Sequence, residues 1–273
     1  MAVISRFAPS PTGYLHLGHA YSAWLGRRRA GIWRLRLEDI DTARCREEYA
    51  TAILEDLAWL GLAWDGEVRV QSRHFPDYAA ALDRLRERGL LYPCFCTRAD
   101  IARAQSAPHA AEGLYPGTCK RLGAGGRALR LAAGEPFALR LDMERARRSV
   151  TRPLRFFEEG EGWTEAWPER HGDAVLARKD TPTSYHLCAV HDDALQCVSH
   201  VIRGEDLRPA THLHVLLQAL LGYETPVYVH HRLLTGPDGR RLAKRDQAQT
   251  LRGLREAGVQ PAEIRTGLER LAA

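Results

Sequence analysis

Residues 5–19 read Ser-Arg-Phe-Ala-Pro-Ser-Pro-Thr-Gly-Tyr-Leu-His-Leu-Gly-His, and they are the most informative stretch of the chain. A short apolar run, Ala2–Ile4, precedes them, and a turn broken by proline and glycine leads into a helical pattern that opens at His19. This order predicts a strand, a turn and the N-terminus of a helix. The unpaired N–H groups and the positive dipole end of a helix N-terminus favour a phosphate group. Because His16 and His19 flank this point and Gly18 lets the backbone approach closely, the stretch predicts a nucleotide site.

Strand-like and helix-like segments alternate over residues 1–91, which we expect to form the first half of a Rossmann-like catalytic domain. Such alternation is typical of an α/β fold in which helices cover a parallel sheet. Ligands of these sheets bind at the carboxyl ends of the strands, where residues 5–19 follow the first one. The expected strands are Val3–Phe7, Trp33–Leu37 and Val68–Gln71, and the expected helices are His19–Arg29, Glu47–Leu60 and Tyr78–Arg88.

The regular alternation stops at residue 92 and resumes near residue 174. Residues 92–173 hold two closely spaced cysteines and a glycine-rich stretch, and we expect them to form an insertion into this fold. Residues 174–234 are expected to be the second half of the catalytic domain, and residues 235–273 a basic loop with C-terminal helices. The segments of regular structure expected after residue 173 are Ala174–Arg178, Tyr185–Val190, Gln196–Arg203, the helix Pro209–Leu221, the strand Val227–His230, and the helices Thr250–Ala257 and Pro261–Leu271.

The composition is that of an ordinary globular protein, with 45% apolar and 27% charged residues among 273. No run of 18 apolar residues exists, so we expect no membrane span, and the N-terminus lacks the layout of a signal peptide. A cytoplasmic protein without a membrane partner is therefore expected. The net charge of +5 and the pI of about 9.0 suit a polyanionic partner such as nucleic acid.

Three of the six cysteines have the spacing of a metal site. Cytosolic thiols stay reduced, which argues against a disulfide framework. Cys94 and Cys96 are one residue apart and Cys119 follows later, so the three predict an incomplete zinc site. A fourth ligand is needed, and residue type alone favours His109, because histidine commonly joins cysteine on zinc.

Two motifs together resemble a known family. Arg-Phe-Ala-Pro-Ser-Pro-Thr-Gly followed by His-Leu-Gly-His is similar to the first signature of class I aminoacyl-tRNA synthetases of the glutamyl and glutaminyl branch. Residues 241–245, Arg-Leu-Ala-Lys-Arg, resemble the KMSKS loop of these enzymes, although Arg241 replaces the usual first lysine and Ala243 the usual serine. In isolation the histidine pair would fit any surface turn, and the basic loop any solvated loop. The resemblance implies a class I synthetase core of the α/β class.

The activity that this resemblance implies is the activation of an amino acid by ATP, with Mg²⁺ accompanying the ATP. The reaction needs no protein nucleophile, because catalysis consists of positioning and of stabilising charge on phosphate oxygens. The expected catalytic residues are therefore His16, His19 and Lys244. The same three residues and Gly18 are the expected ATP-binding residues.

The amino acid implied by the resemblance is L-glutamate. Its carboxylates need cations, which Arg6 and Arg203 would supply, and its ammonium group needs an anion, which Glu38 would supply. A buried arginine rejects neutral glutamine, because a lost charge partner is costly. The chain departs from the family pattern at Ala189, a position where discriminating glutamyl-tRNA synthetases tend to carry asparagine. The resemblance gives the glutamate contacts as Arg6, Phe7, Ala8, Pro9, Ser10, Glu38, Tyr185 and Arg203.

The resemblance also bears on residues 92–173, which it implies to be an inserted subdomain that binds zinc and contacts tRNA. Residues 113–119, Gly-Leu-Tyr-Pro-Gly-Thr-Cys, are similar to the Tyr-x-x-x-Cys half of a zinc site found in this branch. It implies Tyr115, rather than His109, as the ligand that joins Cys94, Cys96 and Cys119. One structural zinc ion is expected, because four protein ligands leave no open position.

The residues that follow the basic loop suggest which acceptor receives the glutamate. Only 28 residues follow Arg245, too few for the anticodon-binding region of a glutamyl-tRNA synthetase. A core of this kind resembles the glutamyl-queuosine tRNA(Asp) synthetases, which attach glutamate to queuosine in the anticodon stem-loop of tRNA(Asp), and a monomer is expected. The alternatives are a minimal glutamyl-tRNA synthetase that charges a tRNA 3′ end, and a non-catalytic RNA-binding module.

Overall fold

The computed structural model describes residues 2–105, 114–234 and 250–272. Its N-terminal part is the predicted parallel sheet, in which β1 pairs with β2 from Ile4↔Ile32 to Phe7↔Leu35, and β2 pairs with β3. The expected strands and helices of this part are confirmed, with small shifts at their ends. They are β1 (Ile4–Phe7), α1 (Leu17–Arg29), β2 (Ile32–Leu37), α2 (Glu47–Trp59), β3 (Arg69–Val70) and α3 (Phe75–Glu87).

The second half of the sheet lies next to β1. The Ser199 main-chain N–H donates to the carbonyl of Ile4 over 2.9 Å, which places β9 beside β1. β9 in turn pairs in parallel with β10, from Val227↔His200 to His231↔Gly204. The elements of this half are α7 (Tyr185–Leu195), β9 (His200–Gly204), α8 (Arg208–Leu221) and β10 (Val227–His231). The chain thus returns to the strand that carries the opening motif.

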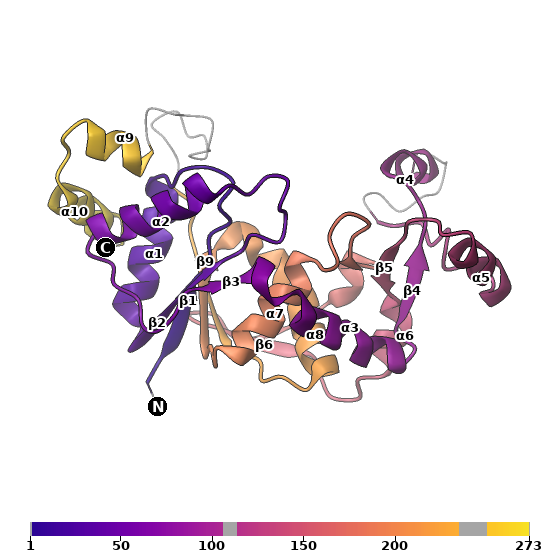
Figure 1. The fold of residues 1–273 in the computed structure, drawn as a ribbon. Helices are drawn as coiled ribbons and strands as arrows, with labels where there is room; N and C mark the ends of the chain where they lie inside the picture. The colour runs from indigo at the N-terminus through magenta and orange to yellow at the C-terminus, as the bar shows by residue number, and fades with distance from the viewer. Residues whose placement is uncertain (1, 106–113, 235–249, 273) are drawn as a thin grey trace.

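A second, antiparallel sheet lies at one end of the molecule. Its order is β4, β5, β8, and Figure 1 shows it with α4 and α5 at the opposite end from α9 and α10. The sequence predicts β8, within residues 174–178, but no individual element of residues 92–173, where β4 and β5 are only four residues long and α5 has no buried residue. They are β4 (Leu91–Cys94), α4 (Arg98–Gln105), α5 (Ala124–Ala132), β5 (Ala138–Leu141), α6 (Met143–Arg148) and β8 (Val175–Ala177).

A hairpin of β6 (Arg155–Glu158) and β7 (Gly162–Glu165) joins the sheet of β9 and β10, because β6 pairs with β10 at Tyr228↔Glu158. This strand comes from within residues 92–173, whereas β8, beyond residue 173, pairs with β5 of the other sheet. Strand pairing therefore crosses the expected limit at residue 173. The physical reason is burial: Phe156 of β6 is fully buried against Tyr228 of β10, a contact between distant residues that local periodicity does not reveal.

The C-terminal helices α9 (Leu251–Glu256) and α10 (Pro261–Ala272) confirm the two helices expected there. They add Leu251 and Leu268 to the apolar core around Trp33, so they pack on the N-terminal half of the molecule. Among the described residues, no helix is both long and apolar enough to cross a bilayer.

Candidate active site

The two histidines of the opening motif form the N-terminal cap of α1. His16 is the cap residue: its Nδ1 accepts from the Gly18 N–H over 3.0 Å, and His19 Nδ1 accepts from the His16 N–H over 3.2 Å. The helix therefore begins at Leu17, two residues before the predicted start, because histidine takes the capping role that serine or aspartate usually fills. Since both Nδ1 atoms accept, each neutral ring carries its proton on Nε2. The two rings lie 3.8 Å apart between centroids.

One pocket of about 380 Å³ collects the predicted residues that the structure describes. It lies where β1, β2 and β9 end and α1 and α7 begin, as expected for the carboxyl edge of a parallel sheet. The predicted residues that line it are Arg6, Phe7, Ala8, Pro9, Ser10, His16, Gly18, His19, Glu38, Tyr185 and Arg203. Both the expected glutamate contacts and the described part of the expected ATP contacts thus share one cavity.

The predicted basic loop lies outside the described residues, and so do Lys244, Arg241 and Ala243. The described chain on either side of it ends at the pocket. Leu234 lines the cavity, and Thr250 forms a β-bridge with His16.

Arg203 is a buried cation whose partners in the described chain are neutral. Its guanidinium donates to Thr211 Oγ1 over 2.7 Å and to His230 Nε2 over 3.1 Å, and it lies 3.4 Å from the Tyr185 hydroxyl and from His214 Nδ1. Burial, followed by the charge of Arg203, lowers the pKa of His214 and of His230, so both rings are uncharged near neutral pH. No carboxylate of residues 2–105, 114–234 or 250–272 pairs with Arg203. A buried, uncompensated cation in a pocket favours an anionic ligand.

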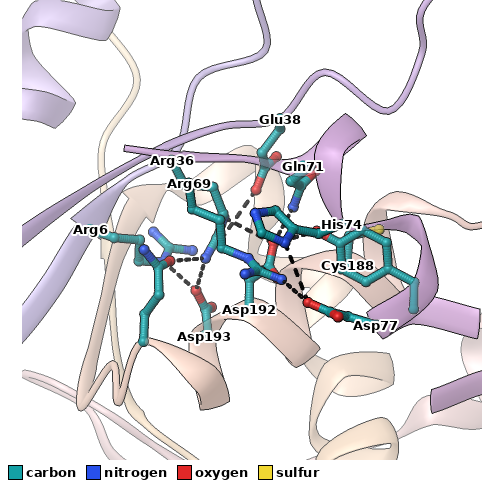
Figure 2. A network of polar contacts seen from close by, with 12 residues as sticks. Arg6, Arg36, Glu38, Arg69, Gln71, His74, Asp77, Cys188, Asp192 and Asp193 are labelled. Atoms are coloured by element: carbon teal, nitrogen blue, oxygen red, sulfur yellow. Dashed lines mark hydrogen bonds and ion pairs between the residues drawn. The ribbon is translucent and has the colours of Figure 1, made fainter. Parts of the chain in front are cut away.

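The charge of Arg6, the second predicted cation, is compensated by the buried carboxylate of Asp193. Its Nε donates to Asp193 Oδ1 over 2.9 Å, and the same oxygen accepts from Arg36 over 2.8 Å (Figure 2). Arg36, fully buried, also donates to Glu38 over 3.2 Å. Burial alone raises the pKa of Asp193, but Arg6 and Arg36 outweigh burial and hold it below its usual value.

Glu38, the predicted anion, lines the same pocket and is almost fully buried. Burial raises its pKa, while the charges of Arg36 and Arg6 act in the opposite direction. A carboxylate held this way gains from an ammonium ligand, which would offset the cost of burying its charge.

Asp192 extends the network toward β3 and α3. It accepts from Arg69 over 2.7 Å, from Gln71 over 2.8 Å and from the Tyr78 hydroxyl over 2.9 Å, and none of its side chain is exposed (Figure 2). Arg36 Nε lies 3.8 Å away. These contacts tie α7, which begins with Tyr185, to β2 and β3.

Sequence reasoning missed Arg36, Asp192 and Asp193. Their signal was present but weak: Arg36 is one of two arginines in a largely apolar strand, and Asp192 and Asp193 are adjacent in a helix rich in apolar residues. It also missed several pocket residues, of which Ser22 could have been found, because it lies one helical turn after His19. The missed lining residues are Tyr21, Ser22, Ile202, Gly204, Asp206, Leu207, His231, Leu233 and Leu234.

A separate cluster brings the three predicted cysteines together. The sulfur atoms of Cys94, Cys96 and Cys119 lie within 4.8 Å of one another, and Cys96 and Cys119 are 3.5 Å apart. The Tyr115 hydroxyl lies 3.3 Å from Cys94 Sγ and 3.6 Å from Cys96 Sγ. Arg140 stacks on the Tyr115 ring at 3.8 Å.

These four side chains fit a tetrahedral metal ion. Zn–S bonds of about 2.3 Å and a Zn–O bond of about 2.0 Å place tetrahedral ligands about 3.5–3.8 Å apart. The Tyr115–Cys96 and Cys96–Cys119 separations, 3.6 and 3.5 Å, lie in that range, and the Tyr115–Cys94 separation of 3.3 Å is slightly shorter. His109, favoured by residue type, lies outside the described residues.

Comparisons with known proteins identify the family of this chain. A family model described as tRNA synthetases class I (E and Q), catalytic domain, matches residues 2–273. The chain is 48% identical to a glutamyl-Q tRNA(Asp) synthetase of Rhodobacter capsulatus, over 96% of this chain and 98% of the relative. It is 44% identical to the protein of that name from Nocardia farcinica, over 95% and 81% respectively.

A solved structure is similar too. The crystal structure of a glutamate tRNA ligase from Elizabethkingia meningosepticum in complex with its amino acid superposes with a TM-score of 0.75 at 28% identity, and the match covers 89% of this chain. The chain spans about half of that ligase, 52% of its length. The chain therefore belongs to the class I tRNA synthetases for glutamate and glutamine, in the glutamyl-Q tRNA(Asp) synthetase branch, and is a ligase of the aminoacyl-tRNA synthetase type.

Proposed function

We propose that this protein activates L-glutamate with ATP and transfers it to the queuosine base in the anticodon stem-loop of tRNA(Asp). The observation that carries the first step is the buried Arg203, whose described partners are all neutral, in a pocket that also holds a helix N-terminus. One wall of the pocket thus favours a carboxylate and another favours phosphate.

Glutamate would lie between the cations and Glu38. Arg203 and Arg6 would face its carboxylates, and Glu38 would accept from its ammonium group. Because the charge of Arg6 is shared with Asp193, Arg203 would contribute more to the rejection of glutamine. A neutral amide in place of the carboxylate would leave a buried cation without its partner, which costs several kcal/mol, or about 100-fold or more in affinity.

ATP would place its phosphates at the N-terminus of α1. The Nε2–H groups of His16 and His19 would donate to phosphate oxygens at the positive end of the helix dipole. A glutamate carboxylate oxygen would attack the α-phosphorus, a P–O bond would form, and the bond to pyrophosphate would break. We assign Lys244 to the charge that develops on the leaving pyrophosphate. Mg²⁺ bound with ATP would neutralise further phosphate charge.

The acceptor assignment is supported by the relatives. The Rhodobacter capsulatus protein, whose printed name is glutamyl-Q tRNA(Asp) synthetase, aligns over 98% of its own length. The net charge of +5 suits an RNA partner. Transfer would join the activated glutamyl carbonyl to a hydroxyl of the base and release AMP.

We also propose that Cys94, Cys96, Cys119 and Tyr115 hold one structural zinc ion. The donor set and its spacing fit, and four protein ligands leave no open position for a reaction. The ion would stabilise residues 92–96 and 115–122, whose apolar cluster is small.

Exchange of radiolabelled pyrophosphate into ATP tests the activation step. The wild-type protein should catalyse exchange with glutamate and, at equal concentration, at least about 100-fold less with glutamine. Arg203→Gln should lower the glutamate-dependent rate by a similar factor. If no amino acid supports exchange, with or without tRNA, the proposal fails and an RNA-binding module is favoured. Exchange with glutamine as fast as with glutamate would contradict the role of Arg203.

A further inference from the structure

Glu158 and His230 form a buried pair directly beside Arg203. Glu158 ends β6 and His230 belongs to β10, and their side chains are only 3% and 1% exposed. Glu158 Oε2 lies 2.7 Å from His230 Nδ1, and Oε1 accepts from the His230 main-chain N–H over 2.9 Å. Both carboxylate oxygens are therefore used to hold one residue.

These contacts fix which nitrogen of His230 carries the proton. A carboxylate only accepts, so Nδ1 must donate to Glu158. The neutral ring then has its lone pair on Nε2, which accepts from Arg203 Nε over 3.1 Å. With the opposite tautomer, an N–H of His230 would face an N–H of Arg203.

The plane of the ring is fixed as well. The imidazole is parallel to the Tyr228 ring, with 5° between the planes and 5.8 Å between the centroids. Thr211 Oγ1 accepts from Arg203 Nη2 over 2.7 Å. The guanidinium is thus held along its Nε and Nη2 edge by groups that carry no charge.

We propose that Glu158 and His230 are positioning residues that set the orientation of Arg203 for the substrate carboxylate, an inference that rests on glutamate being the ligand of this pocket. Glu158 fixes the tautomer of His230, and His230 holds Nε of Arg203 without neutralising it. A carboxylate placed directly on Arg203 would hold it too, but it would compensate the charge that the substrate needs. The neutral imidazole between Glu158 and Arg203 orients the guanidinium but leaves its positive charge uncompensated for the substrate.

His230→Phe tests the proposal most sharply. Phenylalanine keeps the flat ring beside Tyr228 but removes both nitrogens. The KM for glutamate in the exchange assay should rise about 10- to 100-fold, the loss of one hydrogen bond to a charged group. The kcat and the KM for ATP should stay within about twofold of wild type, because the interaction between Arg203 and the glutamate carboxylate stabilises the ground state and the transition state equally.

His230→Gln is the rescue variant. Its amide oxygen can accept from Arg203, so its KM for glutamate should return to within about threefold of wild type. A role in general packing would instead predict that Phe, the closer match in shape, is tolerated better than Gln. That order of effects would overturn the proposal, as would an unchanged KM in His230→Phe.

Glu158→Gln tests the other half of the pair. The amide offers one acceptor and one donor where His230 needs two acceptors, so either one hydrogen bond is lost or the proton of His230 moves to Nε2. The KM for glutamate should rise about tenfold. The matched control is Glu161→Gln on the same hairpin, where Glu161 forms a half-exposed ion pair with Arg208, and its KM for glutamate should not change.

The histidine tautomer provides a readout that does not depend on activity. With ¹⁵N-labelled protein, NMR should show the His230 proton on Nδ1 in the wild type at neutral pH. If the proton is on Nε2, the proposal is wrong even if the enzyme activates glutamate. If Nδ1 is protonated but no amino acid supports exchange, the proposed function fails and the arrangement of Glu158, His230 and Arg203 stands. If His230→Phe does not fold, the KM for glutamate of Glu158→Gln decides the case: a rise of about tenfold supports the proposal, and an unchanged value overturns it.

Discussion

Asp192→Asn should destabilise the protein more than any change at a surface carboxylate. Asp192 is fully buried and uses both oxygens: Oδ1 accepts from Arg69, and Oδ2 accepts from Gln71 and Tyr78. Asparagine has one carbonyl oxygen and one NH₂ group. In either orientation of the amide, a donor therefore faces a donor, and Arg36 loses the negative charge 3.8 Å from its Nε.

The size of the effect follows from these contacts. Breaking a buried charge pair by removing one partner costs about 3–5 kcal/mol. For a chain of this size, such a loss corresponds to a decrease of about 10 °C in the melting temperature. Urea unfolding followed by circular dichroism should show the same loss at an unchanged slope, because the surface exposed on unfolding is the same.

Asp180→Asn is the matched control. Asp180 is 67% exposed and pairs with Arg178 at the surface, so its loss should cost less than about 1 kcal/mol. If Asp192→Asn melts within about 2 °C of wild type, the buried network does not hold α7 against β2 and β3 as described.

Four further predictions concern separate parts of the molecule. Gly18→Ala should weaken ATP binding more than glutamate binding, because the new Cβ would lie 2.9 Å from His16 Cε1; equal effects on both KM values would contradict this. Lys244→Ala should slow exchange with little change in the KM for glutamate, and an unchanged rate would remove Lys244 from the mechanism. Cys96→Ser should lower zinc content and melting temperature together, measured by elemental analysis and calorimetry, and wild-type protein without zinc would refute the site. Burial raises the pKa of Asp56 from 3.8 to about 6, so the folded state binds this proton more tightly than the unfolded state does, and the stability it contributes is lost as the pH rises from about 4 to about 6. Asp56→Asn should therefore flatten the curve of melting temperature against pH in this range. An unaltered curve would show that Asp56 does not cause the pH dependence.

The pocket could be predicted because its residues lie at positions that local sequence defines. Arg6 and Ser10 belong to one continuous segment with His16, and Glu38 directly follows a strand whose alternation is visible in the sequence. The rule that ligands bind at the carboxyl ends of parallel strands then brings these segments together.

The charged network behind the pocket could not be predicted in this way. Composition rules place charges such as Arg36 and Asp192 at the surface, and only the folded structure shows that they satisfy one another. The pairing of β6 with β10 is equally hidden, because it joins Glu158 to a strand about 70 residues later in the chain. The start of α1 was missed for a local reason: histidine rarely caps a helix, and His16 does.

Transfer of glutamate to tRNA(Asp) tests the central claim most directly. The protein would be incubated with ATP, radiolabelled glutamate and tRNA(Asp) whose 3′ CCA has been removed, prepared with and without queuosine. We predict label on the trimmed tRNA only when queuosine is present, and an initial rate about 100-fold lower when Arg203→Gln replaces the wild type. Label that appears only on intact tRNA, regardless of queuosine, would contradict the proposal and identify a glutamyl-tRNA synthetase that charges the 3′ end.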